Sequence, residues 1–272
     1  MATDFLNTPF MTSIIDTCSQ IYQAGWAENH AGNLSYLLTE EEIEAYIGTD
    51  KKVISSRKLE VPCPNLSNKY FLVTAAGSPF KNIIKEPDKH LGIIQINEDG
   101  SGFDIIWGFR GNKRPTSELP THLLCHSERL EADDQHRIVL HCHPDYTIAM
   151  TFMHELDQNA FTKTMWSLNS ECVLVFPEGL GLLPWMVCGN GEIGMETAGK
   201  MKEFRIVIWP HHGILAAGQS VDQALGLIET IEKAARVYVV TDGKRKQCMT
   251  EDQIIALADA FHLNVRKGIV ME

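Results

Sequence analysis

The 272-residue chain lacks two features that would each decide its class. It has no run of about 18 apolar residues, which a membrane-spanning helix would need. It has no long run of Lys and Arg, and its formal charge of -11 would repel nucleic acid and anionic lipid. We therefore expect no membrane and no nucleic acid among its partners. A small anionic ligand remains compatible with a locally positive site, above all around a metal.

Paired cysteine motifs are also missing. The seven cysteines are an odd number, and none of them forms a CxxC pair. The first ten residues, MATDFLNTPF, lack a charged segment followed by an apolar stretch. Reduced thiols and a cytoplasmic location are therefore predicted.

What the chain does contain is an ordinary globular composition, with 44% hydrophobic and 22% charged residues. Such a chain can bury a core. No linker, internal repeat or low-complexity segment divides it. We predict a single domain over residues 1–272, because α/β folds of this length are commonly one domain.

Helical and strand patterns alternate along the chain. Thr8 and Pro9 are typical of a helix start, and Gly25 is placed to end that helix. Strands are expected over 33–38, 70–73, 93–97, 103–107, 137–143, 172–176 and 205–209, with a surface loop over 51–69. Further helices are expected near 119–129, 145–155, 159–168 and 192–203, and towards the end of the chain. The mixture predicts an α/β fold, a three-layer α/β/α sandwich around a central mixed, largely antiparallel sheet.

The strongest local signal is His141-Cys142-His143 at the end of an apolar strand. Alternation along a strand places His141 and His143 on one face, and Pro144 ends the strand there. Two converging imidazoles suit Zn²⁺, which needs a third protein ligand and an open position for catalysis. Taken alone, an HxH pair is more often hydrogen-bonded to backbone or water.

A third imidazole comes from the segment Trp209-Pro210-His211-His212-Gly213, which closes another apolar strand. Either His211 or His212 can face a metal, and the pattern itself does not choose between them. In the absence of the first pair, a solvated loop would be the better interpretation.

A carboxylate comes from the segment Pro115-Thr116-Ser117-Glu118-Leu119-Pro120, where Ser117 is placed to cap a helix. A helix start presents unpaired N–H groups, so Thr116 and Ser117 are candidates for holding phosphate, with Glu118 beside that anion. The commoner role of a Glu at this position is helix capping or a favourable charge in the first turn.

Two glycine-containing segments, Ala31 to Ser35 and Val73 to Ser78, can form anion-binding turns. Ordinary turns are the simpler interpretation. Neither segment matches GxxxxGK[ST] or GxGxxG, so nucleotide binding is not predicted.

Taken together and in order, these motifs resemble the class II aldolase and adducin-head family. Within it, the chain is most similar to members that cleave rhamnulose 1-phosphate. This closer resemblance covers nearly the whole chain and rests on the segments GWAENHAGNLS, PTSELPTH, HCHPD, SECVLVFPEGLGLLPWM and WPHHG. Two positions depart from the pattern: His30 stands where these enzymes usually carry asparagine, and Ala76 replaces a small hydroxyl residue.

The resemblance implies an enzyme that splits a small phosphorylated ketose into dihydroxyacetone phosphate and lactaldehyde. It implies one Zn²⁺ per subunit and a homotetramer. Glu118 would be the catalytic acid/base, and Glu171 would reach the aldehyde half of the substrate, often across a subunit boundary. The implied metal ligands are His141, His143 and His212, and the implied phosphate and substrate contacts are Gly32, Asn33, Gly77, Thr116 and Ser117.

Three alternatives stay open from the sequence. A fuculose-phosphate aldolase or a ribulose-5-phosphate 4-epimerase would use the same zinc histidines with different residues around the sugar tail. A non-enzymatic binding module of the adducin kind would lack the metal ligands, which this chain retains. Product analysis separates the two enzymes from the predicted one.

Overall fold

The computed structural model describes residues 5–47 and 52–270, and their strands form one nine-stranded sheet. Across the sheet the order is β2-β5-β4-β3-β1-β6-β9-β8-β7. The strands are β1 Asn33–Leu37, β2 Ser55–Lys58, β3 Tyr70–Thr74, β4 Leu91–Ile96, β5 Gly102–Gly108, β6 Ile138–Cys142, β7 Gly181–Leu182, β8 Ile206–Trp209 and β9 Gly213–Gly218. The β7–β8 pair is parallel and the other neighbouring pairs are antiparallel. The predicted mixed, largely antiparallel sheet is therefore confirmed.

Along the chain, helices lie before, between and after these strands. The longer helices are α1 Pro9–Gln23, α5 Leu119–Ala132, α6 Asp145–Met153, α7 Gln158–Leu168, α9 Gly191–Met201, α10 Val221–Val240 and α11 Glu251–Ala260. The shorter elements are α2 Glu40–Glu42, α3 Phe80–Ile83, α4 Pro87–His90, α8 Ser170–Val175, the 3₁₀ turns η1 Phe5–Asn7 and η3 Pro64–Leu66, and the π-helical turn η2 Ile43–Ile47.

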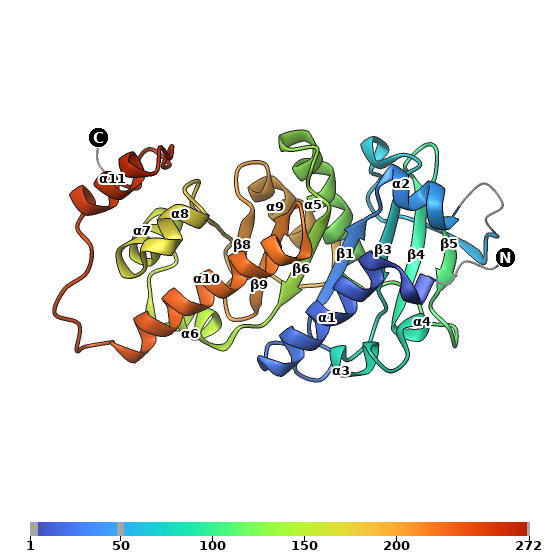
Figure 1. Cartoon of the computed structure of the whole chain (residues 1–272), viewed down its shortest axis with the longest axis horizontal. Helices are drawn as coiled ribbons and strands as arrows, with labels where there is room; N and C mark the ends of the chain where they lie inside the picture. The colour runs from blue at the N-terminus through green and yellow to red at the C-terminus, as the bar shows by residue number, and fades with distance from the viewer. Residues whose placement is uncertain (1–4, 48–51, 271–272) are drawn as a thin grey trace.

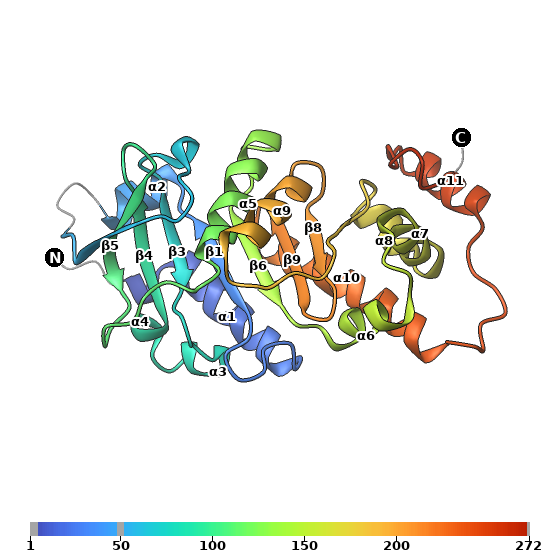
Figure 2. The same cartoon turned by 180° about the vertical axis from the view of Figure 1, so that it is seen from behind.

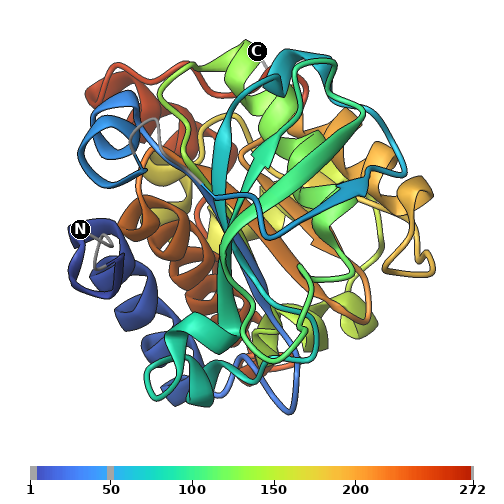
Figure 3. The ribbon, with the colours of Figure 1, turned by 90° about the vertical axis from the view of Figure 1, so that its right-hand side faces the viewer.

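The sheet lies between two helical layers, which confirms the three-layer prediction. Helices α1 and α10 cover one face (Figure 1), and α5 and α9 cover the other (Figure 2). The end-on view in Figure 3 shows the strands between these two layers. Strand β6 shows how the sequence achieves this, because Ile138, Leu140 and Cys142 join the core under α1 and α10, whereas Val139 joins an apolar cluster on the opposite face.

The first helix forms as predicted. The Thr8 side chain accepts a hydrogen bond from the Met11 N–H, and Pro9 occupies the first turn, where its missing N–H leaves no bond unmade. Its buried side chains are Phe10, Met11, Ile14, Thr17, Cys18 and Ile21. Gly25 follows the helix with a φ of +86°, a conformation that glycine adopts without strain.

The strand predicted over 172–176 is wrong, because this segment forms helix α8. The Asn169 side chain accepts a hydrogen bond from the Glu171 N–H and so begins the helix. A short apolar run has the same composition in a buried strand as in a buried helix turn. The cap, and packing of α8 beside α7, α10 and α11, decide in favour of the helix.

Three strands were not predicted. Within the expected surface loop 51–69, of which residue 51 lies outside the described residues, β2 pairs with β5 and Leu66 is fully buried. The second is the two-residue strand β7, which pairs with β8. The third is β9, which is rich in small residues and pairs with both β6 and β8. Its position matters for the site, because the turn from β8 into β9 carries His211 and His212 to the end of β6.

Candidate metal centre and active site

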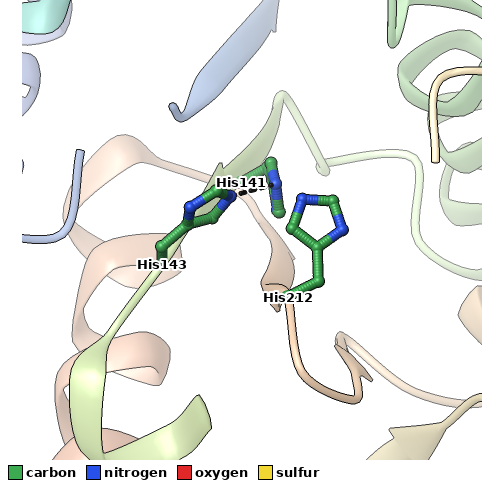
Figure 4. A group of neighbouring side chains, drawn as sticks. All are labelled: His141, His143 and His212. Atoms are coloured by element: carbon green, nitrogen blue, oxygen red, sulfur yellow. Dashed lines mark hydrogen bonds between the residues drawn. The ribbon is translucent and has the colours of Figure 1, made fainter. Parts of the chain in front are cut away.

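Three histidines meet at the end of strand β6 on the face covered by α5 and α9. Figure 4 shows His141 and His143 from the end of β6 beside His212 from the β8–β9 turn. Their ring centroids are 4.9 to 5.1 Å apart, and one ring nitrogen from each lies within 4.8 Å of the others. This cluster can hold a metal ion.

Hydrogen bonds on the far side of two of the rings determine which nitrogens face the cluster. Nδ1 of His141 lies 3.0 Å from the Ile214 carbonyl, and Nδ1 of His143 lies 2.8 Å from the Glu28 carboxylate. Both partners only accept, so both Nδ1 atoms carry the proton and each Nε2 of a neutral ring presents a lone pair. These two Nε2 atoms are 3.2 Å apart. Two lone pairs at this separation repel each other unless a cation lies between them, so the donor set fits a metal.

Burial keeps two of these imidazoles neutral, as metal ligands must be. His141 is fully buried, and burial, followed by the neighbouring His143 and His212, holds its pKa well below the ordinary value. Burial, followed by His143, lowers the pKa of His212 to about 4. Both are therefore ready to bind a cation at neutral pH.

The structure distinguishes His212 from His211, a choice that the residue pattern left open. Nδ1 of His211 lies 3.2 Å from the Thr151 hydroxyl, and its ring packs on Phe152 with centroids 4.1 Å apart. His211 therefore contacts helix α6, whereas His212 joins the other two histidines, as the resemblance implied.

Glu118 lies beside the histidines and is nearly buried, with 9% of its surface exposed. Its Oε2 is 3.8 Å from Nε2 of His141 and accepts a hydrogen bond of 2.9 Å from the Asn33 side-chain amide. Burial raises its pKa above the ordinary value, against smaller lowering effects from Asn33 and His143. A carboxyl with a raised pKa next to a metal-binding cluster is a candidate for general acid/base catalysis.

Glu118 does not cap helix α5 through its side chain, although it occupies the N-cap position. Ser117 does not cap it either, because Ser117 is exposed and the Thr116 hydroxyl accepts a hydrogen bond of 3.3 Å from the Glu118 N–H. The predicted capping role of Ser117 is therefore wrong. Because the Glu118 carboxylate makes no capping bond, it lies beside the histidines instead.

Behind Glu118 runs a buried chain of hydrogen bonds that the sequence analysis missed. Asn33 Oδ1 contacts Nε2 of His122, and Nδ1 of His122 lies 2.8 Å from the Ser35 hydroxyl. That hydroxyl lies 2.8 Å from Nε2 of His126. Two histidines four residues apart on one helix face, opposite a Ser in an apolar strand, are the signal that would have found it.

The two glycine-containing segments come together at the same end of the sheet. The Leu34 N–H donates to the Thr74 hydroxyl at 3.1 Å, and the Thr116 N–H donates to the Thr74 carbonyl at 2.9 Å. Gly32 has a φ of +80°, and a Cβ there would lie 3.2 Å from the Phe80 ring. Gly77 has a φ of +61° with open space where a Cβ would be. Gly32, Asn33, Gly77 and Thr116 thus belong to neighbouring segments.

Three further positions, Glu171, Cys188 and His30, are all exposed but differ in how they relate to the cluster. Glu171 is exposed near the start of α8, and no hydrogen bond or ion pair joins it to the histidines within the described chain. Cys188, which sequence reasoning did not select, is exposed, and its sulfur lies within 4.8 Å of ligand atoms of both Glu118 and His212. His30, one of the two departures, is also exposed.

Comparison with known proteins defines the class to which this site belongs. The family model described as Class II Aldolase and Adducin N-terminal domain matches residues 12–239. The chain therefore belongs to the class II aldolase family. Within the described residues no helix is both long and apolar enough to cross a bilayer.

Relatives within that family are more specific. A rhamnulose-1-phosphate aldolase of Listeria monocytogenes serovar 1/2a is 45% identical over 270 residues, covering 98% of each chain. One of Enterococcus faecalis is 42% identical and covers 98% of this chain and 96% of its own. Among solved structures, a sugar-phosphate aldolase from Thermotoga maritima has a TM-score of 0.73 at 25% identity, covering 84% of this chain and 92% of its own.

Proposed function

We propose that this chain cleaves L-rhamnulose 1-phosphate to dihydroxyacetone phosphate and L-lactaldehyde. The observation that carries the proposal is identity of 42–45% over nearly the full length to proteins named for this reaction. The cluster of histidines with a buried carboxylate beside it supports the same reaction, because carbon–carbon cleavage next to a ketone needs both charge stabilisation and a proton carrier.

We propose zinc as the cofactor, one ion per subunit, held by His141, His143 and His212. Three neutral imidazoles with an open position are a ligand set typical of catalytic zinc. When bound, the ion would supply Lewis-acid stabilisation of the negative charge that develops on the ketone oxygen during cleavage.

Glu118 would carry the proton at the dihydroxyacetone carbon. Its Oε2 is held by the Asn33 amide, which fixes the direction of the carboxylate, and its burial excludes the water that would otherwise compete for the proton. Asn33 on β1 is itself hydrogen-bonded to His122 on α5, so residues of both elements orient the Glu118 carboxylate. Burial raises the pKa of Glu118, which favours uptake of that proton by the carboxylate.

The substrate phosphate would lie against Gly32, Asn33, Gly77, Thr116 and Ser117. Backbone N–H groups at turns of positive φ and short hydroxyl side chains are typical of such sites. We further propose that Glu171 acts at the aldehyde half of the substrate in the site of a neighbouring copy, in a cytoplasmic homotetramer of single-domain chains. Glu171 is exposed and, among the described residues, no hydrogen bond or ion pair joins it to the histidines of its own chain, which supports that role.

The test is metal content of the purified protein together with release of dihydroxyacetone phosphate from rhamnulose 1-phosphate, before and after chelation. About one zinc per chain and cleavage lost on chelation and regained with zinc are the expected results. Bound metal without cleavage would redirect the assignment to fuculose 1-phosphate or to epimerisation of ribulose 5-phosphate, which the products distinguish. Cleavage that persists in fully metal-free protein would contradict the role of the histidines.

A further inference from the structure

Lys113 lies directly behind the loop from Thr74 to Ser78, hereafter the 74–78 loop. Its Nζ donates hydrogen bonds to the carbonyls of Ala76 and Gly77, at 3.3 and 3.2 Å, and to the Ser78 hydroxyl at 3.0 Å. The loop also pairs with the segment that contains Lys113, because the Ala76 N–H donates to the Arg114 carbonyl at 2.8 Å. Three consecutive residues of the loop are therefore held by one ammonium group.

These bonds set the direction of two peptide groups. In a trans peptide the carbonyl and the N–H point in opposite directions. When the Ala76 and Gly77 carbonyls face Lys113, the N–H groups of Gly77 and Ser78 face away from it. Within the described part of the chain neither N–H donates to another protein group. Two successive free N–H groups around a residue with a φ of +61° form a nest of the kind that binds anions.

The charge of Lys113 is not compensated by any carboxylate within ion-pair distance among the described residues. Two nearby cations are paired: Lys89 lies 3.0 Å from Glu86, and Arg110 lies 2.9 Å from Asp88. Burial and then the charge of Lys89 lower the pKa of Lys113. An anion in the nest would supply the missing negative charge.

His90 supports the loop from the other side of Ser78. Its Nδ1 lies 2.9 Å from the Ser78 hydroxyl, and its Nε2 is buried without a hydrogen-bond partner. A buried lone pair without a partner is tolerated better than a buried N–H without one, so we place the proton on Nδ1. The Ser78 hydroxyl then accepts from both Lys113 and His90, which fixes this side chain on the Lys113 side of the loop.

We propose that Lys113 is the positioning residue and counter-charge for the substrate phosphate, holding the 74–78 loop so that the Gly77 and Ser78 N–H groups face that anion. This inference rests on the proposed function for the identity of the substrate. It adds a cation to a site whose other proposed contacts, Gly32, Asn33, Gly77, Thr116 and Ser117, are all neutral. Lys113 acts through the loop and does not take part in the chemical step.

Lys113→Met tests the proposal with inorganic phosphate as the probe. We expect the inhibition constant of phosphate and the KM for rhamnulose 1-phosphate to rise by about tenfold or more, with kcat nearly unchanged, because the lost interaction acts equally in ground and transition states. Inhibition by dihydroxyacetone, which carries no phosphate, should stay at the wild-type level. Lys85→Met is the matched control, since Lys85 is an exposed lysine nearby that makes none of these bonds.

A phosphate inhibition constant unchanged in Lys113→Met would overturn the proposal, as would an equal loss of dihydroxyacetone binding. Calorimetric titration of zinc-loaded protein with phosphate needs no turnover, so Lys113-dependent phosphate binding can be established even where rhamnulose 1-phosphate is not cleaved. If Lys113→Met does not fold, Lys113→Gln retains an N–H donor for the loop carbonyls and removes only the charge. Wild-type phosphate affinity in that variant would equally refute the proposal.

Discussion

The two faces of the central sheet are built from different kinds of side chain. Under α1 and α10, strand β6 contributes Ile138, Leu140 and Cys142 to one continuous apolar core. On the other face, polar residues separate two smaller apolar clusters. Ser35 on β1 lies between these two clusters. Its neighbour on β3 is Val73, which belongs to one cluster, and its neighbour on β6 is Val139, which belongs to the other.

This difference shows how the fold accommodates a reactive carboxylate. A buried polar group is costly unless it is hydrogen-bonded, so a chain of polar partners from Glu118 to His126 occupies the gap between the two clusters. The apolar face contains the largest of the three apolar clusters and supplies most of the hydrophobic stabilisation. We therefore expect changes on the polar face to alter turnover and changes on the apolar face to alter the free energy of unfolding.

The largest expected effect is a loss of kcat from a change on the polar face. Glu118→Gln keeps the shape of the side chain and removes its capacity to exchange a proton, so kcat should fall by roughly 10² to 10⁴. Zinc content, measured by atomic absorption, should match that of the wild type, because Glu118 is not among the proposed ligands. A wild-type rate in this variant would remove Glu118 from the mechanism.

A matched pair of substitutions then tests the comparison itself. Leu140→Ala opens a cavity on the apolar face and should lower the free energy of unfolding by about 2 to 5 kcal/mol, with little effect on kcat. His122→Leu removes the partner of Asn33 Oδ1 and one of the two histidine partners of the Ser35 hydroxyl. It should cost about 1 to 3 kcal/mol and also lower kcat by roughly tenfold, since the Glu118 carboxylate loses its support.

Denaturant titration and steady-state kinetics on both proteins provide the measurement for this pair. If Leu140→Ala reduced kcat as much as His122→Leu does, stability alone would explain the loss and the two faces would not differ in function. Retention of the full wild-type kcat by His122→Leu would show that Asn33 orients Glu118 without help.

Measured per pH unit, the smallest expected effect is the dependence of the free energy of unfolding on pH. Burial lowers the pKa of both His122 and His126 to about 3, from an ordinary value of 6.5. The unfolded chain therefore takes up protons first as the pH falls, so their contribution is complete above pH 6.5 and is lost progressively towards pH 3. Each histidine adds a slope of up to about 1.4 kcal/mol per pH unit.

His126→Gln isolates this contribution, because the amide can still bond to Ser35 but does not titrate. Unfolding of metal-free wild type and variant should be followed between pH 6.5 and about pH 4.5. The variant should lose stability less steeply, by about 1.4 kcal/mol per pH unit. Parallel curves for the two proteins would mean that His126 does not titrate on unfolding in this range.

Much of this arrangement could be predicted from the sequence, because it depends on local periodicity. Alternation along residues 138–143 placed His141 and His143 on one face, and the cap and apolar spacing of residues 8–23 predicted the first helix. The class II aldolase resemblance supplied His212, which the local pattern could not separate from His211. Helix α8 was missed because a short apolar run is ambiguous until its cap and its packing partners are known.

The parts that could not be predicted depend on contacts between distant segments. Asn33 and Glu118 are 85 residues apart in sequence, and Asn33 and His122 are 89 apart. Lys113 contacts a loop 35 to 37 residues earlier in the chain. No periodicity specifies such pairs, because they arise only when the sheet order places β1 between β3 and β6.

The position of Trp209 has a practical consequence. Its indole ring lies 5.0 Å from the rings of both His141 and His212, and its N–H is held by the Thr197 hydroxyl at 3.0 Å. A rigid fluorophore in contact with two of the three clustered imidazoles senses the charge placed on them. Its emission therefore offers an unlabelled optical signal for filling and emptying of the histidine cluster, independent of any assay of the reaction.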